Sequence, residues 1–348
     1  MKVSFNIPTY NRSIYLDKNL RIMVDQINRL NCHNDVEINI SDNASTDDTN
    51  IVVKKLINEN PRIRINYSCN KDNLGPDRNF LLAMNMAKGE YSLLWGDDDF
   101  LKEGGLKRIF ELIQFGESNN VQILFSSTTV VDEKGRFVRE KNFLRNDIKE
   151  LLVDFSNVNE ARSFFFLLKD TGGLLSFISD VIYKTSIIKE IKYRESFTGT
   201  HYAFLCFWWG WLAKGNKLFY SNQSFLNETV QYQPAYGYGV KRTMVDYCGF
   251  KLIADELLQD TEFRNDFMQG FDNTHSPLSF RMLYLTEPEL FSSRIVPIMR
   301  ECGKDNLDFE LLYNSCSLSN LIKGLLYKIM PKKVIMLIKA TKFKCYSR

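Results

Sequence analysis

The 348-residue chain lacks the marks of a disulfide-stabilised, zinc-binding or membrane-spanning protein. Its seven cysteines are odd in number and include no C-x-x-C pair, which argues against a disulfide framework and a zinc site. No stretch approaches the roughly 18 uninterrupted apolar residues of a spanning helix. The first eight residues, MKVSFNIP, carry no long apolar run and so do not predict a signal peptide. We therefore expect a cytoplasmic protein of one large or two modest domains.

Two common nucleotide-binding signatures are also absent. No G-x-G-x-x-G follows an expected strand, and G-x-x-x-x-G-K-[ST] does not occur anywhere in the chain. These absences argue against dinucleotide-dependent redox chemistry and against P-loop phosphoryl transfer. Nucleic acid is not among the expected partners.

Acidic residues are missing from the end of the chain. None follows Glu310, whereas eight basic residues do, which leaves 37 basic against 42 acidic residues in the body. Within residues 319–348, apolar side chains share one helical face with lysines beside it: Leu321, Ile322, Leu325, Leu326 and Ile329. This basic amphipathic pattern favours a helix lying on an anionic membrane surface, and the alternative is a helix packed on the body.

Short apolar runs alternate with helical patterns through the first part of the chain. The expected strands cover residues 3–7, 36–41, 63–67 and 91–95. Strands separated by helices of this length are typical of βαβ units, so we predict an α/β fold with a mostly parallel sheet flanked by helices. The unusual polar residues fall where the strands end, and open α/β sheets bind ligands at that edge.

Three consecutive carboxylates, Asp97, Asp98 and Asp99, follow the last of these strands. Adjacent acids repel one another unless a cation lies among them. Mg²⁺ and Mn²⁺ take carboxylate oxygens together with substrate phosphates, so the triplet predicts a divalent-metal site for a phosphorylated ligand. The alternative is that Asp99 caps a helix expected over residues 100–115. A calcium loop does not fit, because Lys102 stands where such a loop requires glycine.

Four segments, in order, resemble glycosyltransferase family 2, which has the GT-A fold. They are residues 7–12 (IPTYNR), 41–47 (SDNASTD), 73–79 (NLGPDRN) and 96–99 (GDDD). The resemblance covers about the first 130 residues. The amino-acid sequences of the second and third segments are similar to those of bacterial O-antigen transferases of the abequosyltransferase type, which use CDP-activated 3,6-dideoxyhexoses.

The resemblance implies roles on the donor side. Pro8, Tyr10 and Arg12 would line the nucleotide pocket, and Asp42 would accept a hydrogen bond from the base. Arg78 would donate to the diphosphate or to Asp98. The metal carboxylates would be Asp98 and Asp99, with the division of roles among the three acids left open. The remaining residues expected to bind the nucleotide-sugar are Asn43, Asn73, Gly75 and Asp97. As alternatives, Pro8 and Tyr10 are ordinary turn residues, and Arg78 pairs with Asp72 or Asp77.

Sugar transfer also needs a base, because the acceptor hydroxyl must lose a proton as it attacks the anomeric carbon. The family usually has an acidic pair before the aromatic helix expected at residues 202–212, and no such pair exists here. The candidates are Asp180, within an apolar strand expected at 177–183, Glu195 and His201. As alternatives, Glu195 is a solvated loop charge and His201 a helix-start residue capped by Thr200.

The second half of the chain is less informative. Residues 232–239 form an aromatic, glycine-punctuated loop that predicts either a lid or a packed surface loop. Residues 130–145 predict a charged, solvated hairpin without a functional role. We expect a GT-A domain over residues 1–240, with a nucleotide-sugar half to about residue 130 and an acceptor half after it. A helical region would follow over residues 241–348.

The function predicted from these features is metal-dependent transfer of a sugar from a nucleotide-diphosphate donor, CDP or UDP favoured, to a lipid-linked oligosaccharide. The sugar could be a 3,6-dideoxyhexose such as abequose. The setting would be O-antigen or capsule biosynthesis at the inner face of the cytoplasmic membrane, with Mn²⁺ or Mg²⁺ as cofactor. The alternatives are a non-catalytic nucleotide-sugar-binding module and a nucleotidyltransferase. The latter needs a basic triphosphate loop near the N-terminus, for which Arg12 alone is weak support.

Overall fold

The structure, a computed structural model, describes residues 1–132, 134–229, 240–274, 289 and 291–297. The chain divides into two compact units, Met1–Val230 with Leu252–Thr274, and Gln231–Lys251 with His275–Arg348. All site residues treated below lie in the first unit. The lid expected at residues 232–239 and the amphipathic tail expected at 319–348 lie outside the described residues, and the expected domain boundaries stay predictions.

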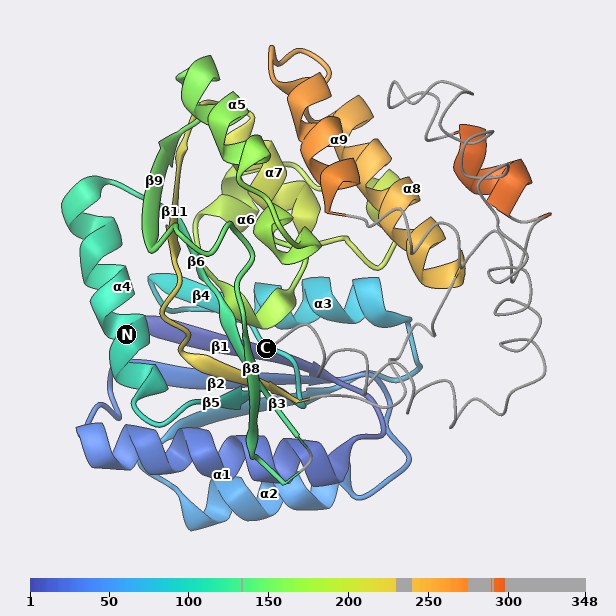
Figure 1. Cartoon of the computed structure of the whole chain (residues 1–348). Coiled ribbons are helices and arrows are strands. Elements are labelled where there is room, and N and C mark those ends of the chain that lie inside the picture. Colours follow the sequence, from blue (N-terminus) through green and yellow to red (C-terminus); the bar gives the residue numbers. More distant parts are fainter. Residues whose placement is uncertain (133, 230–239, 275–288, 290, 298–348) are drawn as a thin grey trace. The chain divides into compact units, whose positions relative to one another are not determined.

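An eight-stranded sheet forms the centre of the first unit, in the order β3-β2-β1-β4-β10-β6-β11-β9 (Figure 1). Its strands are β1 Val3–Thr9, β2 Val36–Asp42, β3 Arg64–Cys69, β4 Tyr91–Leu94, β6 Ile123–Ser126, β9 Glu150–Asp154, β10 Val181–Lys184 and β11 Lys217–Ser221. Strands β1 to β4 pair in parallel, as do β6 and β11, whereas β10 and β9 run antiparallel to their neighbours. The predicted parallel sheet and its first four strands are therefore confirmed.

The direction of strand β10 is important for the site, and the sequence did not predict it. It is antiparallel to β4, with Ile182 opposite Leu93. The residues just before β10 consequently lie beside the residues just after β4. The strand expected at 177–183 is partly wrong, since a 3₁₀ turn, η2 Ile178–Asp180, precedes β10. Asp180 is thus at the start of the strand and at the same edge of the sheet as the acid triplet.

Within the first unit, helices cover both faces of the sheet. The helices of the described residues are α1 Ser13–Leu30, α2 Thr49–Glu59, α3 Pro76–Asn85, α4 Gly105–Asn119, α5 Val158–Phe166, α6 Ile187–Glu190, α7 Leu205–Leu212, α8 Val240–Glu256 and α9 Arg264–Asn273, of which α8 lies mostly in the second unit. Shorter turns are η1 Thr171–Leu174, η3 Glu195–Phe197 and η4 Phe291–Ile295. In Figure 1, α3 lies on one face of β1 and β2, and α1 lies on the other.

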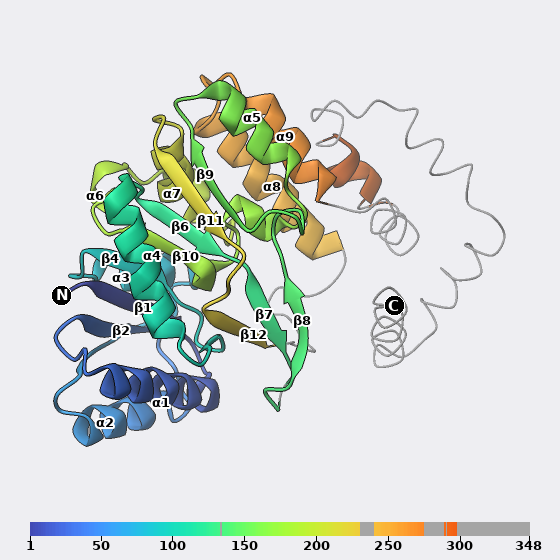
Figure 2. The same ribbon diagram turned by 60° about the vertical axis from the view of Figure 1, so that its left-hand side comes forward.

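A second, four-stranded sheet, in the order β5-β12-β7-β8, begins directly after the acid triplet. Its strands β12, β7 and β8 are labelled in Figure 2. Its strands are β5 Phe100–Leu101, β7 Thr128–Val131, β8 Phe137–Lys141 and β12 Leu226–Thr229. Because residues 100–101 pair with β12, they cannot begin a helix, and α4 starts only at Gly105 with Gly104 as its N-cap. The alternative role of Asp99 as a helix cap is therefore wrong. The hairpin expected at 130–145 is confirmed as β7 and β8.

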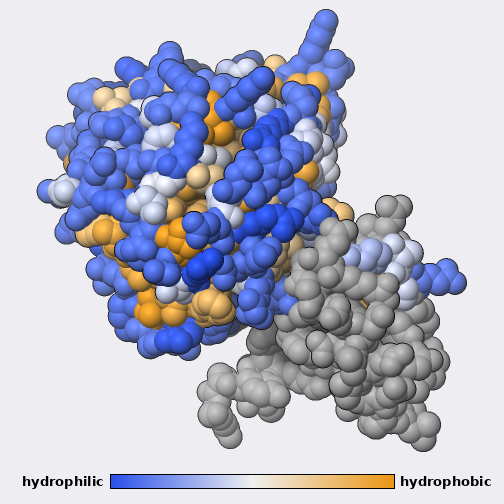
Figure 3. All heavy atoms as spheres, turned by 90° about the horizontal axis from the view of Figure 1, so that it is seen from above, coloured by the Kyte–Doolittle hydropathy of each residue, from blue (hydrophilic) through white to orange (hydrophobic). Residues whose placement is uncertain are grey.

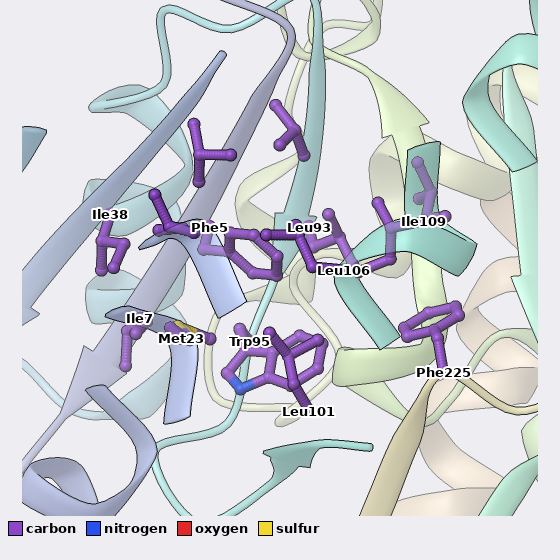
Figure 4. Close-up of a cluster of buried hydrophobic side chains, with 14 of the residues drawn as sticks. Phe5, Ile7, Met23, Ile38, Leu93, Trp95, Leu101, Leu106, Ile109 and Phe225 are labelled. Atoms are coloured by element: carbon purple, nitrogen blue, oxygen red, sulfur yellow. The ribbon is translucent and has the colours of Figure 1, made fainter. Parts of the chain in front are cut away.

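A hydrophobic core fixes the backbone from which the acids project. Alternate residues of β1 point toward α1 and α4, and Trp95 lies among them (Figure 4). The ring of Trp95 meets Phe5 edge-on at 5.3 Å and stacks on Phe225 at 6.3 Å between centroids. Its indole N–H donates to the carbonyl oxygen of Asp99 at 2.9 Å. Burying a side chain of this size contributes about 2–3 kcal/mol, so the acid triplet is held by one of the best-anchored residues of the core.

The surface gives no sign of a spanning segment in the described residues. None of their helices combines the length and the apolar character needed to cross a bilayer. On the face shown in Figure 3, hydrophilic residues predominate and apolar residues form small patches between them.

Candidate active site

The buried side-chain amide of Asn43 connects the loops that follow β1, β2 and β3. The backbone N–H of Asn43 donates to the Thr9 carbonyl at 2.9 Å, and its side-chain amide donates to Asn73 Oδ1 at 2.8 Å. Its side-chain oxygen accepts from the Leu74 N–H at 2.9 Å. Gly75 precedes α3 with φ at +81°, a left-handed conformation that glycine adopts without strain. Asn43, Asn73 and Gly75 therefore shape the predicted nucleotide edge, and their contacts within the protein show a structural role.

Asp42, the residue expected to accept from the base, lies at the end of β2 and is buried. The Tyr67 hydroxyl donates to its Oδ2 at 2.6 Å, and the Ser45 N–H donates to its Oδ1 at 2.8 Å. Burial and the neighbouring carboxylate raise the pKa of Tyr67, so its proton stays on the phenol. Each carboxylate oxygen has a second lone pair, so Asp42 keeps acceptor capacity. Sequence reasoning missed Tyr67, because nothing in its strand marks the contact with Asp42.

The other two predicted pocket residues differ in exposure. Pro8 lies within β1, where it is paired with Ser41 of β2 and buried. Tyr10 follows the strand and keeps 43% of its surface exposed. Of these two residues, Tyr10 is therefore the one whose ring is accessible for stacking on a base.

The acid triplet meets Arg12 from the loop after β1. Arg12 Nε lies 3.1 Å from Asp97 Oδ1, and Arg12 Nη2 donates to Asp98 Oδ2. Thr9 Oγ1 donates to Asp97 Oδ2 at 2.8 Å. Asp99 has a different partner, since Ser179 Oγ donates to its Oδ2 at 2.5 Å. The structure thus pairs Arg12 with Asp97 and Asp98, whereas Asp99 is bound to Ser179.

The negative charge of the acid triplet is only partly neutralised by Arg12. Burial raises the pKa of Asp97 to about 7, an effect that Arg12 opposes and the charge of Asp98 strengthens. Burial, together with the charge of Asp98, also raises the pKa of Asp99 well above its ordinary value. A single guanidinium therefore does not compensate these carboxylates, and a further cation would stabilise them.

Gly96 leaves the space that the Asp99 carboxylate occupies. A Cβ at this position would lie 2.7 Å from Asp99 Oδ2 and 3.3 Å from Ser179 Oγ. The Gly96 N–H donates to Ser179 Oγ at 2.8 Å, and its carbonyl accepts from the Asn19 amide at 3.0 Å. Any side chain here would displace the carboxylate of Asp99, which explains why glycine precedes the acids.

The donor set suits a hard divalent cation, although the side chains are not gathered around a single point. Carboxylate oxygens are the ligands that Mg²⁺ and Mn²⁺ prefer. In the part of the chain that the structure describes, no group of three or more His, Cys, Asp or Glu side chains converges as a metal site. Asp98 is shared with Arg12, and Asp99 is bound to Ser179. The residues therefore fit a cation held by Asp98 and Asp99, provided that Arg12 gives up Asp98.

The three candidate bases have very different surroundings. Asp180 is fully buried, and within the described residues neither of its carboxylate oxygens has a hydrogen-bond partner. Burial raises its pKa well above the ordinary value, Lys141 opposes the shift, and Glu228 and Asp99 add to it. Glu195 is exposed and makes a two-point ion pair with Arg78, which lowers its pKa.

His201 has a left-handed backbone, with φ at +65°, an uncommon conformation for a residue other than glycine. Its N–H donates to Asp77 Oδ2 at 2.9 Å. Asp77 also accepts from the N–H groups of Gly199 at 2.8 Å and Ala203 at 3.2 Å. Asp77 was missed as a functional residue; the only signal was an acid in the first turn of a helix, which does not identify a partner 122 to 126 positions away.

The partner found for Arg78 differs from those expected. Its guanidinium donates to both carboxylate oxygens of Glu195, at 3.1 and 2.6 Å, and not to Asp72 or Asp77. The pair joins the first turn of α3 to η3. A role of Arg78 at the diphosphate stays a prediction.

Lys141 was also missed, because the hairpin that carries it was expected to be solvated. Its Nζ lies 3.3 Å from each carboxylate oxygen of Glu228, and 5.5 Å from the ring centroids of Phe143 and Phe177. Thr128 Oγ1 also donates to Glu228 at 2.8 Å. The expectation of a solvated hairpin is therefore wrong at Lys141, where β8 turns a charged side chain inward.

Comparison with known proteins agrees with the motifs. The model of the family described as "Glycosyl transferase family 2" matches residues 4–171. Just under half of the chain is therefore similar to glycosyl transferase family 2. The resemblance stated from the four segments is confirmed, and the family segment carries the acid triplet, Arg12, Asp42 and Arg78.

Two curated relatives extend the family match. Abequosyltransferase RfbV of Salmonella typhimurium is 34% identical over 203 residues, which are 58% of each chain. The GalNAc(5)-diNAcBac-PP-undecaprenol beta-1,3-glucosyltransferase of Campylobacter jejuni is 26% identical over 199 residues, 57% of this chain and 56% of that protein. The match thus spans a little over half the length of either relative.

Solved structures agree with the fold of this chain. Residues 1–349 of TarS from S. aureus, in complex with UDP, align with a TM-score of 0.55 at 21% identity over 79% of this chain and 70% of that one. The mannosyltransferase PcManGT from Pyrobaculum calidifontis, in complex with GDP-Man and Mn²⁺, aligns with a TM-score of 0.54 at 14% identity over 100% and 88%. The predicted GT-A fold is confirmed.

Proposed function

We propose that the protein is a glycosyltransferase that moves a sugar from a nucleoside diphosphate donor to an acceptor hydroxyl. One observation carries the proposal. A buried acid triplet, paired with Arg12, lies at the same sheet edge as Asp180, a buried carboxyl group without a partner in the described residues. The similarity of residues 4–171 to glycosyl transferase family 2 supports it.

On the donor side, the loops after β1 and β2 would hold the nucleotide. Asp42 would accept a hydrogen bond from the base, with Tyr67 fixing its orientation, and the exposed ring of Tyr10 would stack on the base. Arg12 and Arg78 would donate to the diphosphate, whose oxygens match the planar guanidinium. Asp98 and Asp99 would hold Mn²⁺ or Mg²⁺. Such a cation, when bound, supplies charge neutralisation for the departing diphosphate.

On the acceptor side, Asp180 would act as the base. The acceptor oxygen forms a bond to the anomeric carbon as the bond between that carbon and the diphosphate oxygen breaks. The hydroxyl proton passes to the Asp180 carboxylate, and the electron pair of the broken bond leaves with the diphosphate. A carboxyl group with a pKa raised by burial is a better proton acceptor than an exposed one. Glu195 is the weaker candidate, since its ion pair with Arg78 lowers its pKa.

The names of the relatives support a finer assignment. One is an abequosyltransferase, and the name of another contains a PP-undecaprenol substrate. We therefore assign a 3,6-dideoxyhexose such as abequose as the candidate sugar, with CDP or UDP as its carrier. The acceptor would be a lipid-linked oligosaccharide at the inner face of the cytoplasmic membrane, in O-antigen or capsule biosynthesis. The basic segment 319–348 would hold the protein there.

The test compares the parent protein with Asp98→Ala and with Asp35→Ala, an exposed aspartate before β2 at the opposite edge of the sheet. CDP-, UDP-, GDP- and dTDP-sugars are screened with Mn²⁺, first for binding and then for turnover onto extracted lipid-linked oligosaccharide. We expect a pyrimidine nucleotide to bind best, and Asp98→Ala to lose both binding and turnover. Binding without turnover in the parent would instead favour a non-catalytic nucleotide-sugar-binding module. Preference for GDP would contradict the role of Asp42.

Membrane association is tested separately. Removal of residues 319–348 is expected to move the protein from the membrane fraction to the supernatant after sedimentation. Unchanged sedimentation would contradict the anchoring role of this segment.

A further inference from the structure

Arg12 pairs with Asp97 and with Asp98, one of the two acids that would hold the metal, and its side chain can change partners while its backbone stays in place. The backbone of its loop is fixed, because the Asn11 N–H donates to Ser45 Oγ at 2.9 Å and Asn11 Oδ1 accepts from the Thr46 N–H at 2.7 Å. The guanidinium of Arg12 lies 4.9 Å from the ring centroid of Tyr15, and 28% of its side chain is exposed. A side chain on a fixed loop, partly open to solvent, can move between two anionic partners without refolding the loop.

The same oxygens attract a guanidinium and a divalent cation. Arg12 Nη2 donates to Asp98 Oδ2, and Arg12 Nε lies 3.1 Å from Asp97 Oδ1. A divalent ion bound at Asp98 would lie within a few ångströms of the guanidinium, where two positive charges repel strongly. Cation binding at Asp98 therefore requires Arg12 to leave, or the ion must bind with reduced affinity.

A diphosphate offers Arg12 an alternative partner. Guanidinium groups bind phosphate oxygens through two parallel hydrogen bonds, as they bind carboxylates. The diphosphate would arrive together with the cation, so the exchange moves Arg12 from one set of anionic oxygens to another.

We propose that Arg12 is an exchangeable counter-ion, which neutralises Asp97 and Asp98 in the donor-free protein and transfers to the diphosphate when the divalent cation binds. This inference rests on the proposed function. Its consequence is that the cation and the nucleoside diphosphate bind cooperatively, since each lowers the cost of moving Arg12. Arg12 is then a positioning residue whose effect appears in binding before any turnover occurs.

The experiment measures Mn²⁺ binding by electron paramagnetic resonance of the free ion and by calorimetry, without nucleotide and then with CDP or UDP. The variants are Arg12→Met, which keeps the length of the side chain without its charge, and Arg12→Lys. The matched control is Arg21→Met, since Arg21 also lies on the α1 side of the molecule and pairs with two carboxylates, Asp17 and Glu59. Circular dichroism establishes that each variant is folded.

We expect Arg12→Met to bind Mn²⁺ alone at least tenfold more tightly than the parent, and Arg21→Met to stay within twofold. In the parent, CDP or UDP should tighten Mn²⁺ binding at least tenfold, and in Arg12→Met less than threefold. Arg12→Lys should fall between the two, because an ammonium is a point charge that cannot span both carboxylates. If Arg12→Met does not fold, the inference is tested by whether Arg12→Lys binds Mn²⁺ more tightly than the parent.

Unchanged or weaker Mn²⁺ binding in the two Arg12 variants would overturn the inference, as would equal Mn²⁺ affinity of the parent with and without nucleotide. Absence of Mn²⁺ binding in every variant would overturn both the inference and the metal site. Tighter Mn²⁺ binding in Arg12→Met, combined with no donor turnover in the parent, would contradict the proposed function and leave the inference standing.

Discussion

Replacement of Asp180 by asparagine should separate catalysis from stability. In most buried aspartates the substitution removes hydrogen bonds and weakens the fold. Asp180 is fully buried, and in the described part of the chain neither oxygen has a hydrogen-bond partner to lose. Asparagine has nearly the same shape and no charge. The variant should therefore lose activity without losing stability.

The expected changes in rate and in stability follow from the role of Asp180 as a base and from the burial of its charge. A positioned base is worth roughly 10²- to 10⁴-fold in rate, which corresponds to about 3–5 kcal/mol in the activation barrier. Burial raises the pKa of Asp180, so the carboxylate costs folding free energy at neutral pH. The attraction of Lys141 does not outweigh this burial cost, and Glu228 and Asp99 add repulsion, so removing the charge should raise the free energy of unfolding.

The sign of the pH dependence is fixed by the direction of the shift. An aspartate whose folded-state pKa is raised holds its proton more tightly in the folded than in the unfolded chain. The parent should therefore lose stability as the pH rises above the unfolded pKa of about 4, up to the raised value. Asp180→Asn lacks this loss, so the stability difference between variant and parent should grow as the pH rises above about 4, until the pH reaches the raised pKa of Asp180.

The assay combines urea unfolding across that pH range with kcat for donor turnover, and Asp35→Asn serves as the control for loss of one exposed charge. Full activity in Asp180→Asn would remove Asp180 from the chemistry. A loss of stability above about 1 kcal/mol would show that its carboxylate has a stabilising partner, which contradicts the argument from burial.

Three further substitutions test the surroundings of the site. Asp77→Asn should lower the free energy of unfolding by about 2–4 kcal/mol in urea, because an amide cannot accept from all three N–H groups that Asp77 binds. Gly96→Ala should reduce both kcat/KM and Mn²⁺ affinity at least tenfold, since its Cβ would lie 2.7 Å from Asp99 Oδ2; unchanged values would contradict the packing argument. Burial works against the lowered pKa of Asp47, but hydrogen bonds from Thr49 and from N–H groups at the starts of α1 and α2 produce it. Asp47→Asn should therefore lower the melting temperature at pH 7, and the difference should close as the pH falls from about 4 through the lowered pKa of Asp47, where the parent becomes protonated as well.

The part of the site that sequence could predict is the part built from contiguous segments. Each of the first four strands is an apolar run, and its polar continuation falls at the carboxyl edge of a parallel sheet. The acid triplet was found in this way, and the resemblance to glycosyltransferase family 2 pointed to Arg12 and Asp42, which also follow or end a strand. Their position depends only on where a strand ends, which a local pattern reveals.

The pairings at the site depend on tertiary placement, and these were missed. Tyr67 reaches Asp42 across neighbouring strands, and Arg78 reaches Glu195 over 117 residues. No spacing rule connects residues that meet only after the sheet and its loops have assembled. The same holds for Lys141, whose hairpin reads as charged and solvated until β12 brings Glu228 beside it.

The antiparallel direction of β10 explains how one site draws on both halves of the sheet. Ser179, just before that strand, accepts a hydrogen bond from the Gly96 N–H at 2.8 Å and donates one to Asp99 Oδ2 at 2.5 Å. Asp180 is the next residue, so the candidate base and a candidate metal ligand are held at a fixed separation by one buried hydroxyl. Because Ser179 has a single proton to donate, a shift of Asp99 toward a cation would release that proton for another acceptor. Donor binding at the acids would then alter the hydrogen bonds next to Asp180, which links the two sides of the proposed reaction through a short segment of chain.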